Sequence, residues 1–337
     1  MATRFRAIFP DIRSQSWTVT IDDPDYVGAV VEVDCIGGFK LRHQGEGKGM
    51  YNYIMGSSLA FSIAVSATTR TALETFQVDL IDIPEGTLSI KVVRGSDLYW
   101  IGYIMPDLCK FDDKEDAFEF NVTAVDGLAK LKGVDYKDTS GLTDRPYTAL
   151  SFLEHILNCL NESGLSTLYF NPTTDIFLRT VVNWVDATMG APAAVKDPLR
   201  YSRVSGEVFA KRKETAAEDY DFFSCYEVLK QICIHWKARL LFSNGCYRFE
   251  QIDERRQDTF YERRWSSDMT LISSDNNMQY DRTVNQTINA ARLAGGQYGY
   301  LPALYKMKVK YDHKTYKNHA QNLLWKWHKD STENNPH

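Results

Sequence analysis

The segment from Gly56 to Lys132 constrains the fold most strongly, because it reads as three strands in succession. Apolar and polar side chains alternate from Thr87 to Val93, and the residues from Leu98 to Met105 are apolar or aromatic on both faces. The turn Arg94-Gly95-Ser96-Asp97 joins them, which is typical of a β-hairpin. Alternation from Ala117 to Ala124 predicts a third strand. The sequence therefore predicts a β-rich module whose strand over 98–105 is central and covered on both faces.

The order of the predicted elements divides the 337 residues into three parts. Residues 1–140 read as an N-terminal β module with a short helix over 73–81. Residues 141–250 read as an α+β middle domain. Residues 251–337 read as a C-terminal β module that ends in a polar tail. The fold class is therefore α+β and mainly β.

Local signals place the elements of the middle domain. A helix is predicted over Ala149–Ser163, with Gly164 as its C-cap, and a short strand over Thr167–Phe170. A second helix follows the capping box Ser224-x-x-Glu227. Behind it the Asn244-Gly245 turn lies between two apolar runs, which is the strongest short signal for a β-hairpin.

Composition excludes several classes of protein. The net charge of -5 gives no general reason to expect nucleic-acid binding. The six cysteines are scattered without a C-x-x-C pair and are predicted to be reduced; Cys159, Cys225 and Cys233 fall on helical patterns as small core residues. The first residues lack the apolar run of a signal peptide, and no apolar stretch has the length of a membrane span.

A search for reaction chemistry finds no catalytic, metal-binding or cofactor motif, so no cofactor is predicted. The loop Gly45–Gly49 lacks phosphate-loop spacing. The acidic run at Asp112, Asp113, Glu115 and Asp116 lacks the pattern of a calcium loop, and the seven histidines show no zinc spacing. A pair of catalytic carboxylates as in a glycoside hydrolase is not excluded by the sequence, because the two residues of such a pair come from distant positions.

The segment from Lys306 to Lys329 is basic and contains tyrosines and tryptophans. Basic residues between aromatic ones can bind single-stranded nucleic acid. Lys306, Lys308 and Lys310 occupy alternate positions, which is also the pattern of a strand with one solvent-exposed face. Lysines on an edge strand prevent unwanted pairing with another strand. We favour a subunit interface or a solvated edge, and predict no specific nucleic-acid partner.

Several segments together resemble a family of bacteriophage tail proteins, tail-tip or baseplate hub components that are common in phages and prophages of Bacteroidetes. The matching segments occur in order over most of the chain: Met55–Leu59, Leu98–Asp107, Phe118–Lys132 with its Thr123-Ala124-Val125-Asp126-Gly127-Leu128, Asn183-Trp184, Asp197–Leu199 and Tyr226–Ile252. Each is a scaffold signature rather than a catalytic motif.

The resemblance implies two tail-tube-like β-barrel or sandwich modules with an α/β insertion between them. It implies a homo-oligomer, in the first place a trimer, that forms a ring-shaped hub between the tail tube and the distal tail, spike or receptor-binding parts. The expected location is the virion tail, assembled in the host cytoplasm. Members of this family often have further C-terminal domains after a segment of this length. Any spike, adhesin or lytic function of such domains is expected to be absent here or to come from another protein.

The candidate scaffold or interface residues are therefore Trp100, Tyr103, Asp126, Gly127, Lys306, Lys308 and Lys310. The alternative function is a β-rich adhesin or carbohydrate-binding tail module, and a tail-associated hydrolase is a third class. A glycan binder would expose an aromatic groove in the monomer, whereas a hub would bury its aromatic side chains.

Overall fold

The computed structural model describes residues 2–11, 14–45, 52–111, 119–141, 144–182, 197–213, 220–251, 254 and 260–278. The fold is mainly β and is built on one large mixed sheet, which confirms the predicted fold class. The first half of this sheet contains β1 (Ala2–Pro10), β2 (Ser16–Asp23), β3 (Val31–Glu32), β4 (Asp34–Gly45), β5 (Ile54–Ala64), β6 (Ser89–Arg94), β7 (Asp97–Ile104), β8 (Lys110–Phe111) and β9 (Glu119–Val125).

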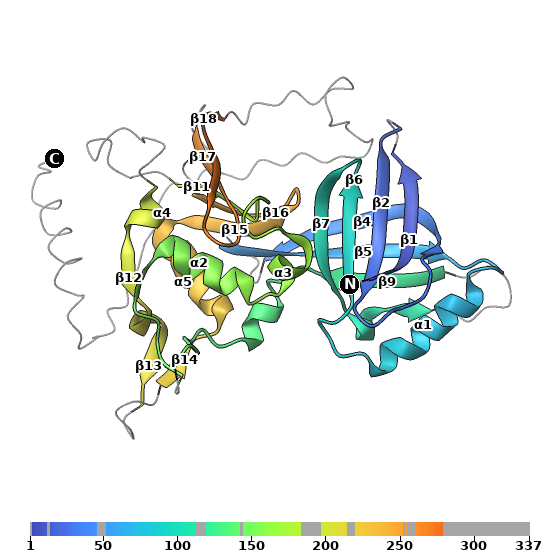
Figure 1. Cartoon of the computed structure of the whole chain (residues 1–337), viewed down its shortest axis with the longest axis horizontal. Coiled ribbons are helices and arrows are strands. Elements are labelled where there is room, and N and C mark those ends of the chain that lie inside the picture. The colour runs from blue at the N-terminus through green and yellow to red at the C-terminus, as the bar shows by residue number, and fades with distance from the viewer. Residues whose placement is uncertain are drawn as a thin grey trace, which may run out of the picture. The chain divides into compact units, whose positions relative to one another are not determined.

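These strands form a closed circuit, which we call the barrel. Neighbouring strands pair in the order β1-β2-β6-β7-β9-β5, and β4 pairs with the other edge of β5. The circuit closes because β3 pairs in parallel with β1 and is separated from β4 by Val33 alone, whose N–H donates to the Arg6 carbonyl at 2.9 Å. In Figure 1, β1, β2, β6 and β7 cross β4, β5 and β9.

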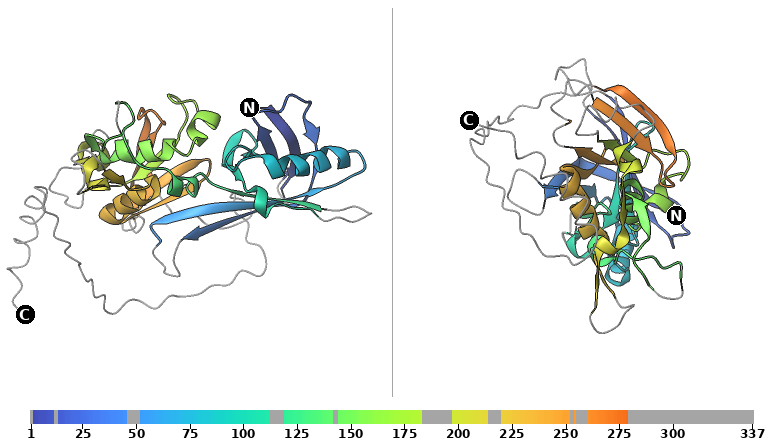
Figure 2. Two further views of the ribbon diagram at one scale, coloured as in Figure 1. Left: turned by 90° about the horizontal axis from the view of Figure 1, so that it is seen from below. Right: turned by 90° about the vertical axis from the view of Figure 1, so that its left-hand side faces the viewer.

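Helix α1 (Arg70–Asp82) connects β5 to β6 and packs against the barrel (Figure 2). Its buried residues are Leu73, Phe76 and Leu80, spaced as one helical face requires. The Phe76 ring meets the rings of Phe5 at 5.1 Å and Phe120 at 5.9 Å, both edge to face. The helix predicted over 73–81 is therefore present and is longer at both ends.

Strand β7 is buried on both faces over its second half, as its sequence predicts. Each residue from Trp100 to Ile104 is buried, although successive side chains point to opposite faces. Gly102 allows the close packing: a Cβ at this position would lie 2.3 Å from both the Trp100 ring and the Val125 carbonyl oxygen.

The second half of the sheet continues from the barrel through one parallel pairing. Leu240 and Leu241 pair with Ile54 and Met55 of β5. From there the order is β15-β16-β11-β17-β18, with a parallel pair between β11 and β16. The bounds are β11 (Leu178–Val181), β15 (Ala238–Ser243), β16 (Cys246–Gln251), β17 (Phe260–Trp265) and β18 (Leu271–Met278).

Helices α2 (Phe152–Asn161) and α5 (Cys225–Trp236) lie together beside this half of the sheet (Figure 1). Both begin with a complete capping box, at Ser151 with Glu154 and at Ser224 with Glu227. The smaller elements nearby are α3 (Leu165–Tyr169), α4 (Pro198–Tyr201), the strand pairs β10 (Ala149–Ser151) with β12 (Arg203–Ser205) and β13 (Ala210–Arg212) with β14 (Tyr220–Phe222), and the short 3-10 helices Lys130–Gly133 and Gly206–Phe209. Another described 3-10 helix, Pro106–Leu108, follows β7 in the barrel.

Several local predictions for this half are confirmed. The Asn244-Gly245 turn joins β15 to β16 with φ angles of 51° and 76°, the left-handed backbone of a tight hairpin turn. Cys159, Cys225 and Cys233 are buried core residues of the helical layer. Among the described helices, none has the length and apolar character needed to cross a membrane.

The strand predicted over 167–170 is wrong. Residues 167–169 belong to α3, which runs from Leu165 to Tyr169, and Phe170 is the extended residue that ends it. Gly164 at φ 81° reverses the chain after α2, and the Phe170 N–H then donates to the Ser166 carbonyl. A run of four residues is too short for its side-chain pattern to separate a strand from a helical turn.

The last described strands join the same sheet, since β17 pairs with β11 and β18 pairs with β17. The strand predicted over 304–311 and the three lysines Lys306, Lys308 and Lys310 lie outside the described residues. A separate C-terminal barrel therefore stays a prediction.

Candidate functional site: the joint between the barrel and the helical layer

Four of the predicted scaffold residues lie where the barrel meets the helices of the second half, a region that we call the joint. It comprises Ser57 of β5, Trp100 and Tyr103 of β7, Asp126 and Gly127 after β9, and Ser163, Tyr169 and Tyr247 from the second half. Trp100 is fully buried, at 0% exposure. Its indole Nε1 donates to the Ser57 hydroxyl at 2.8 Å, which joins β7 to β5 through side chains.

Asp126 is bound to Ser57 by reciprocal hydrogen bonds. One carboxylate oxygen, Oδ2, accepts from the Ser57 N–H at 2.5 Å and from its hydroxyl at 2.7 Å. The other, Oδ1, accepts from the Leu128 N–H at 3.1 Å. The Asp126 N–H in turn donates to the Ser57 carbonyl at 3.0 Å. The carboxylate is thereby fixed where β9 ends and the chain turns toward the helices.

The electrostatics of Asp126 follow from its complete burial. Removal from water disfavours the ionised form and raises the pKa of Asp126 to about 6, although the hydrogen bonds from Ser57 and Leu128 and the charge of His43 act in the opposite direction. His43 lies on β4, and its Nε2 is 3.1 Å from the Phe242 carbonyl oxygen.

Gly127 provides the space in which the two halves touch. A Cβ at this position would lie 2.7 Å from Ser163 Cβ, 3.0 Å from Leu165 Cδ1 and 3.0 Å from the Tyr247 hydroxyl. Any larger residue would push the α2–α3 connection or β16 away. The turn after β9 therefore needs Asp126 to accept hydrogen bonds from Ser57 and Leu128, and it needs Gly127 because a side chain there would not fit.

Tyr103 and Tyr169 connect the outer face of the barrel to the helical layer. The Tyr103 hydroxyl donates to the Ser163 carbonyl at 2.9 Å, and burial raises the pKa of Tyr103 to about 12. The Tyr169 hydroxyl, from α3, donates to the Asp22 carboxylate of β2 at 2.9 Å and also bonds Ser89 of β6. The region around Asp22, Ser89 and Tyr103 on this face is therefore held against the helical layer by polar contacts.

The β15–β16 turn adds a backbone contact to the joint. The Gly245 N–H donates to the Tyr99 carbonyl of β7 at 2.8 Å. Tyr99 is available because β7 bulges at this point: Val92 faces Trp100 while Val93 faces Leu98. A Cβ at Gly245 would lie 2.2 Å from the Leu98 carbonyl oxygen, so this contact also requires glycine.

A second polar cluster neutralises charge on β11, β16 and β17. Glu262 is fully buried and lies 2.7 Å from Arg264, 3.5 Å from Arg179 and 3.6 Å from Arg248. Arg179 stands directly opposite both Arg248 and Arg264 in the strand register, so three like charges face one another there. Glu262 offsets them together with Glu250, which lies 2.9 Å from Arg248.

Chemically, the joint can fix two halves of a sheet to one another. Within the ranges that the structure describes, no group of three histidine, cysteine or acidic side chains is placed to hold a metal ion. Trp100, Tyr103, Asp126 and Gly127, which the sequence indicates as scaffold residues, lie together in the structure. No local sequence pattern marks Ser57 individually, nor His43, Tyr169 or Tyr247.

Comparison with known proteins gives structural matches alone. No protein-family model matches the chain, and no curated protein matches its sequence. The 43 kDa tail protein of prophage MuSo2 from Shewanella oneidensis is similar over 63% of this chain and 54% of its own, with 12% identity and a TM-score of 0.33. The tail protein from Neisseria meningitidis MC58 is similar over 63% of this chain and 50% of its own, with 9% identity and a TM-score of 0.31.

The chain thus spans about half the length of these two solved proteins. Similarity at this level concerns part of the backbone and assigns neither fold nor function to this chain.

Proposed function

We propose that this chain is a structural protein of a bacteriophage tail, which forms a ring-shaped hub at the tail tip or baseplate and connects the tail tube to the spike or receptor-binding parts. The observation that carries the proposal is the convergence at the joint. Three segments that resemble tail-hub proteins, around Ser57, Trp100 and Asp126, are far apart in the sequence and meet in one buried network.

The geometry of the joint supports a structural role. Both carboxylate oxygens of Asp126 accept hydrogen bonds from the chain itself, and the Trp100 indole is fully buried. These side chains are used to hold strands together and have no contact with solvent through which they could act on a substrate. We therefore propose that the protein has no enzymatic activity.

The proposed partners are other copies of the chain, in a homo-oligomer that we take to be a trimer, and the tail-tube, distal-tail or spike proteins on either side of the ring. The proposed location is the virion tail, after assembly in the host cytoplasm. A closed ring suits a chain that must connect a tube to a tip, because closed symmetry limits growth.

The alternative, a carbohydrate-binding tail module, would need aromatic ring faces open to solvent. Trp100, the most prominent aromatic residue of the hairpin, is buried instead. Tyr103 and Tyr169 use their hydroxyl groups within the joint. These observations favour the hub over the glycan binder.

The test is to locate the chain in particles of the phage or prophage that encodes it. Purified tails would be analysed by mass spectrometry, labelled with antibodies against the chain and imaged by cryo-electron microscopy. We expect label and density at the tail tip or baseplate, in a few copies per particle. Particles that lack the chain, or that carry it on the head, would refute the proposal.

A further inference from the structure

The end of the barrel that carries the β6–β7 turn has a cluster of aromatic rings around one arginine, which we call the aromatic end. Its members are Phe9, Trp17, Phe39, Tyr99 and Arg94, all partly exposed. Phe9 stands opposite Trp17, and Trp17 opposite Arg94, in the strand register. The bulge in β7 adds Tyr99 to this set. The register therefore gathers these side chains from separate strands at one place.

Arg94 lies between two aromatic rings and forms no ion pair within the described residues, although Asp97 stands opposite it in the strand register. The centre of its guanidinium lies 5.8 Å from the Trp17 ring and 5.7 Å from the Tyr99 ring. Its Nε is buried, and within the described residues neither a hydrogen-bond acceptor nor a carboxylate pairs with this side chain. The free donors of a guanidinium favour a carboxylate from outside.

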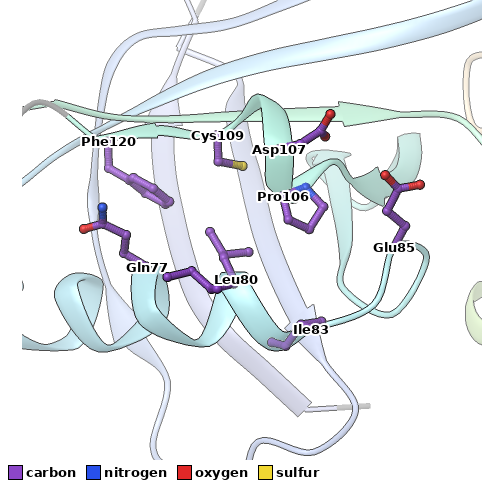
Figure 3. Close-up of a pocket in the computed structure, with 9 residues that line it drawn as sticks. Gln77, Leu80, Ile83, Glu85, Pro106, Asp107, Cys109 and Phe120 are labelled. Carbon is purple, nitrogen blue, oxygen red and sulfur yellow. The ribbon is translucent and has the colours of Figure 1, made fainter.

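A pocket of about 430 Å³ lies at the opposite end of the same hairpin (Figure 3). Its apolar lining includes Leu80 and Ile83 of the α1 region, Pro106 and Phe120. Glu85 and Asp107 stand at one end of it (Figure 3); both are exposed, and neither forms an ion pair within the part of the chain that the structure describes. We call this the acidic pocket.

These two surfaces complement each other but cannot meet within one chain. Glu85 precedes β6 and Asp107 follows β7, whereas Arg94 ends β6, and the six residues of β6 alone extend over about 20 Å. One surface offers aromatic rings and a cation, and the other an apolar hollow with two anions. Trp, Tyr and Arg are also the residues most enriched at the energetic centres of protein interfaces.

We propose that the aromatic end of one copy binds the acidic pocket of the next copy, in a head-to-tail interface between identical chains. The inference builds on the proposed function, in which the chain works as a homo-oligomer. A head-to-tail contact generates a ring when its rotation closes. A sugar ligand is disfavoured, because the Trp17 ring packs edge to face with both Phe39 at 5.3 Å and Tyr99 at 4.9 Å, so these rings cover one another.

The first experiment measures association of the full-length chain by sedimentation and light scattering over a range of concentrations. Arg94→Glu and the double variant Glu85→Lys/Asp107→Lys should each weaken association by about tenfold or more, since each places like charges across the interface. Arg212→Glu is the matched control, because Arg212 is exposed on β13 away from both surfaces, and it should associate as the wild type does. Thermal unfolding of each variant checks that the fold is kept.

The second experiment mixes the two charge-reversed variants. The Arg94→Glu chain keeps an intact acidic pocket, and the other variant keeps an intact aromatic end. The mixture should therefore regain the association that neither variant shows alone, because an intact aromatic end meets an intact acidic pocket and the two altered surfaces also carry opposite charges. A head-to-tail contact should then give assemblies of the wild-type size, whereas a twofold contact between identical surfaces would stop at a one-to-one complex.

Three results would overturn the inference: a wild-type chain that stays monomeric at all concentrations, charge-reversed variants that associate like the wild type, or a mixture that forms no complex. Binding of a sugar array that Trp17→Ala abolishes would also overturn it, because the aromatic end would then be a glycan site. If the variants associate like the wild type while labelled tails contain the chain at their tip, the aromatic end and the acidic pocket are not the interface, but the proposed tail function is retained.

Discussion

Ser57 and Asp126 hold each other by three hydrogen bonds, two from Ser57 to the carboxylate and one from the Asp126 N–H to the Ser57 carbonyl. The Ser57 hydroxyl also accepts from Trp100. Three strands of the barrel, β5, β7 and β9, are thereby fixed at the point where β15 joins the sheet. This small network therefore holds three barrel strands together beside the pairing of β5 with β15.

Replacement of Trp100 by alanine should lower the free energy of unfolding by about 3–5 kcal/mol, because it leaves a large cavity among fully buried neighbours. Trp100→Phe is the matched comparison: it keeps one six-membered ring but loses part of the indole volume and the Nε1 donor to Ser57, so its cost should be about 1–3 kcal/mol, below that of Trp100→Ala. Denaturant unfolding followed by circular dichroism measures both. A loss below about 1 kcal/mol for Trp100→Ala would place the indole on an exposed surface instead.

Asp126 should make the protein more stable as the pH falls from 7 to 5. Its pKa in the folded state is raised to about 6, above the ordinary value of 3.8, so folding takes up a proton in this range. For a group with a raised folded pKa, this contribution is fully present below the unfolded value and is lost as the pH rises through about 6. The expected gain is on the order of 1 kcal/mol.

Asp126→Asn, which cannot titrate, isolates the effect of Asp126 from that of the other carboxylates. The difference in unfolding free energy, wild type minus Asp126→Asn, should increase as the pH falls from 7 to 5. Parallel pH profiles for the two proteins would show that Asp126 does not have a raised pKa.

Gly127→Ala should destabilise the protein by about 1–3 kcal/mol, because its Cβ would overlap Ser163 and approach Leu165 and Tyr247. Gly133→Ala is the matched control, since a Cβ there would meet no atom within 4 Å. Thermal and denaturant unfolding of both variants give the comparison. Equal stability of the two would mean that the helical layer is not in close contact with the Asp126-Gly127 turn.

Tyr169→Phe should lower the free energy of unfolding by about 1–3 kcal/mol, because it removes the hydrogen bond to the Asp22 carboxylate and leaves that buried group with one donor fewer. Tyr201→Phe serves as the control: Tyr201 is 55% exposed, and its change should stay within about 0.5 kcal/mol. Hydrogen exchange should also show faster opening of α3 in Tyr169→Phe. Unchanged exchange there would argue against this contact between α3 and the barrel.

Local sequence determined much of the fold. The capping boxes at Ser151 and Ser224 define where two helices start, and Asn244-Gly245 defines a hairpin turn, because each depends on neighbours a few residues apart. The burial of Trp100 was also predictable, since β7 carries apolar side chains on both faces.

Only the tertiary structure decided the rest. Ser57 reaches Asp126 over 69 positions and Trp100 over 43, and Tyr169 reaches Asp22 over 147. The overall course of the chain brings these residues into contact, and no sequence pattern within a single helix or strand predicts that course. The same holds for the closure of the barrel through β3 and β4 and for the joining of β17 to β11. A sequence pattern shows which face of a strand is buried, because that depends on its own period, whereas the residue it is buried against depends on contacts between distant segments.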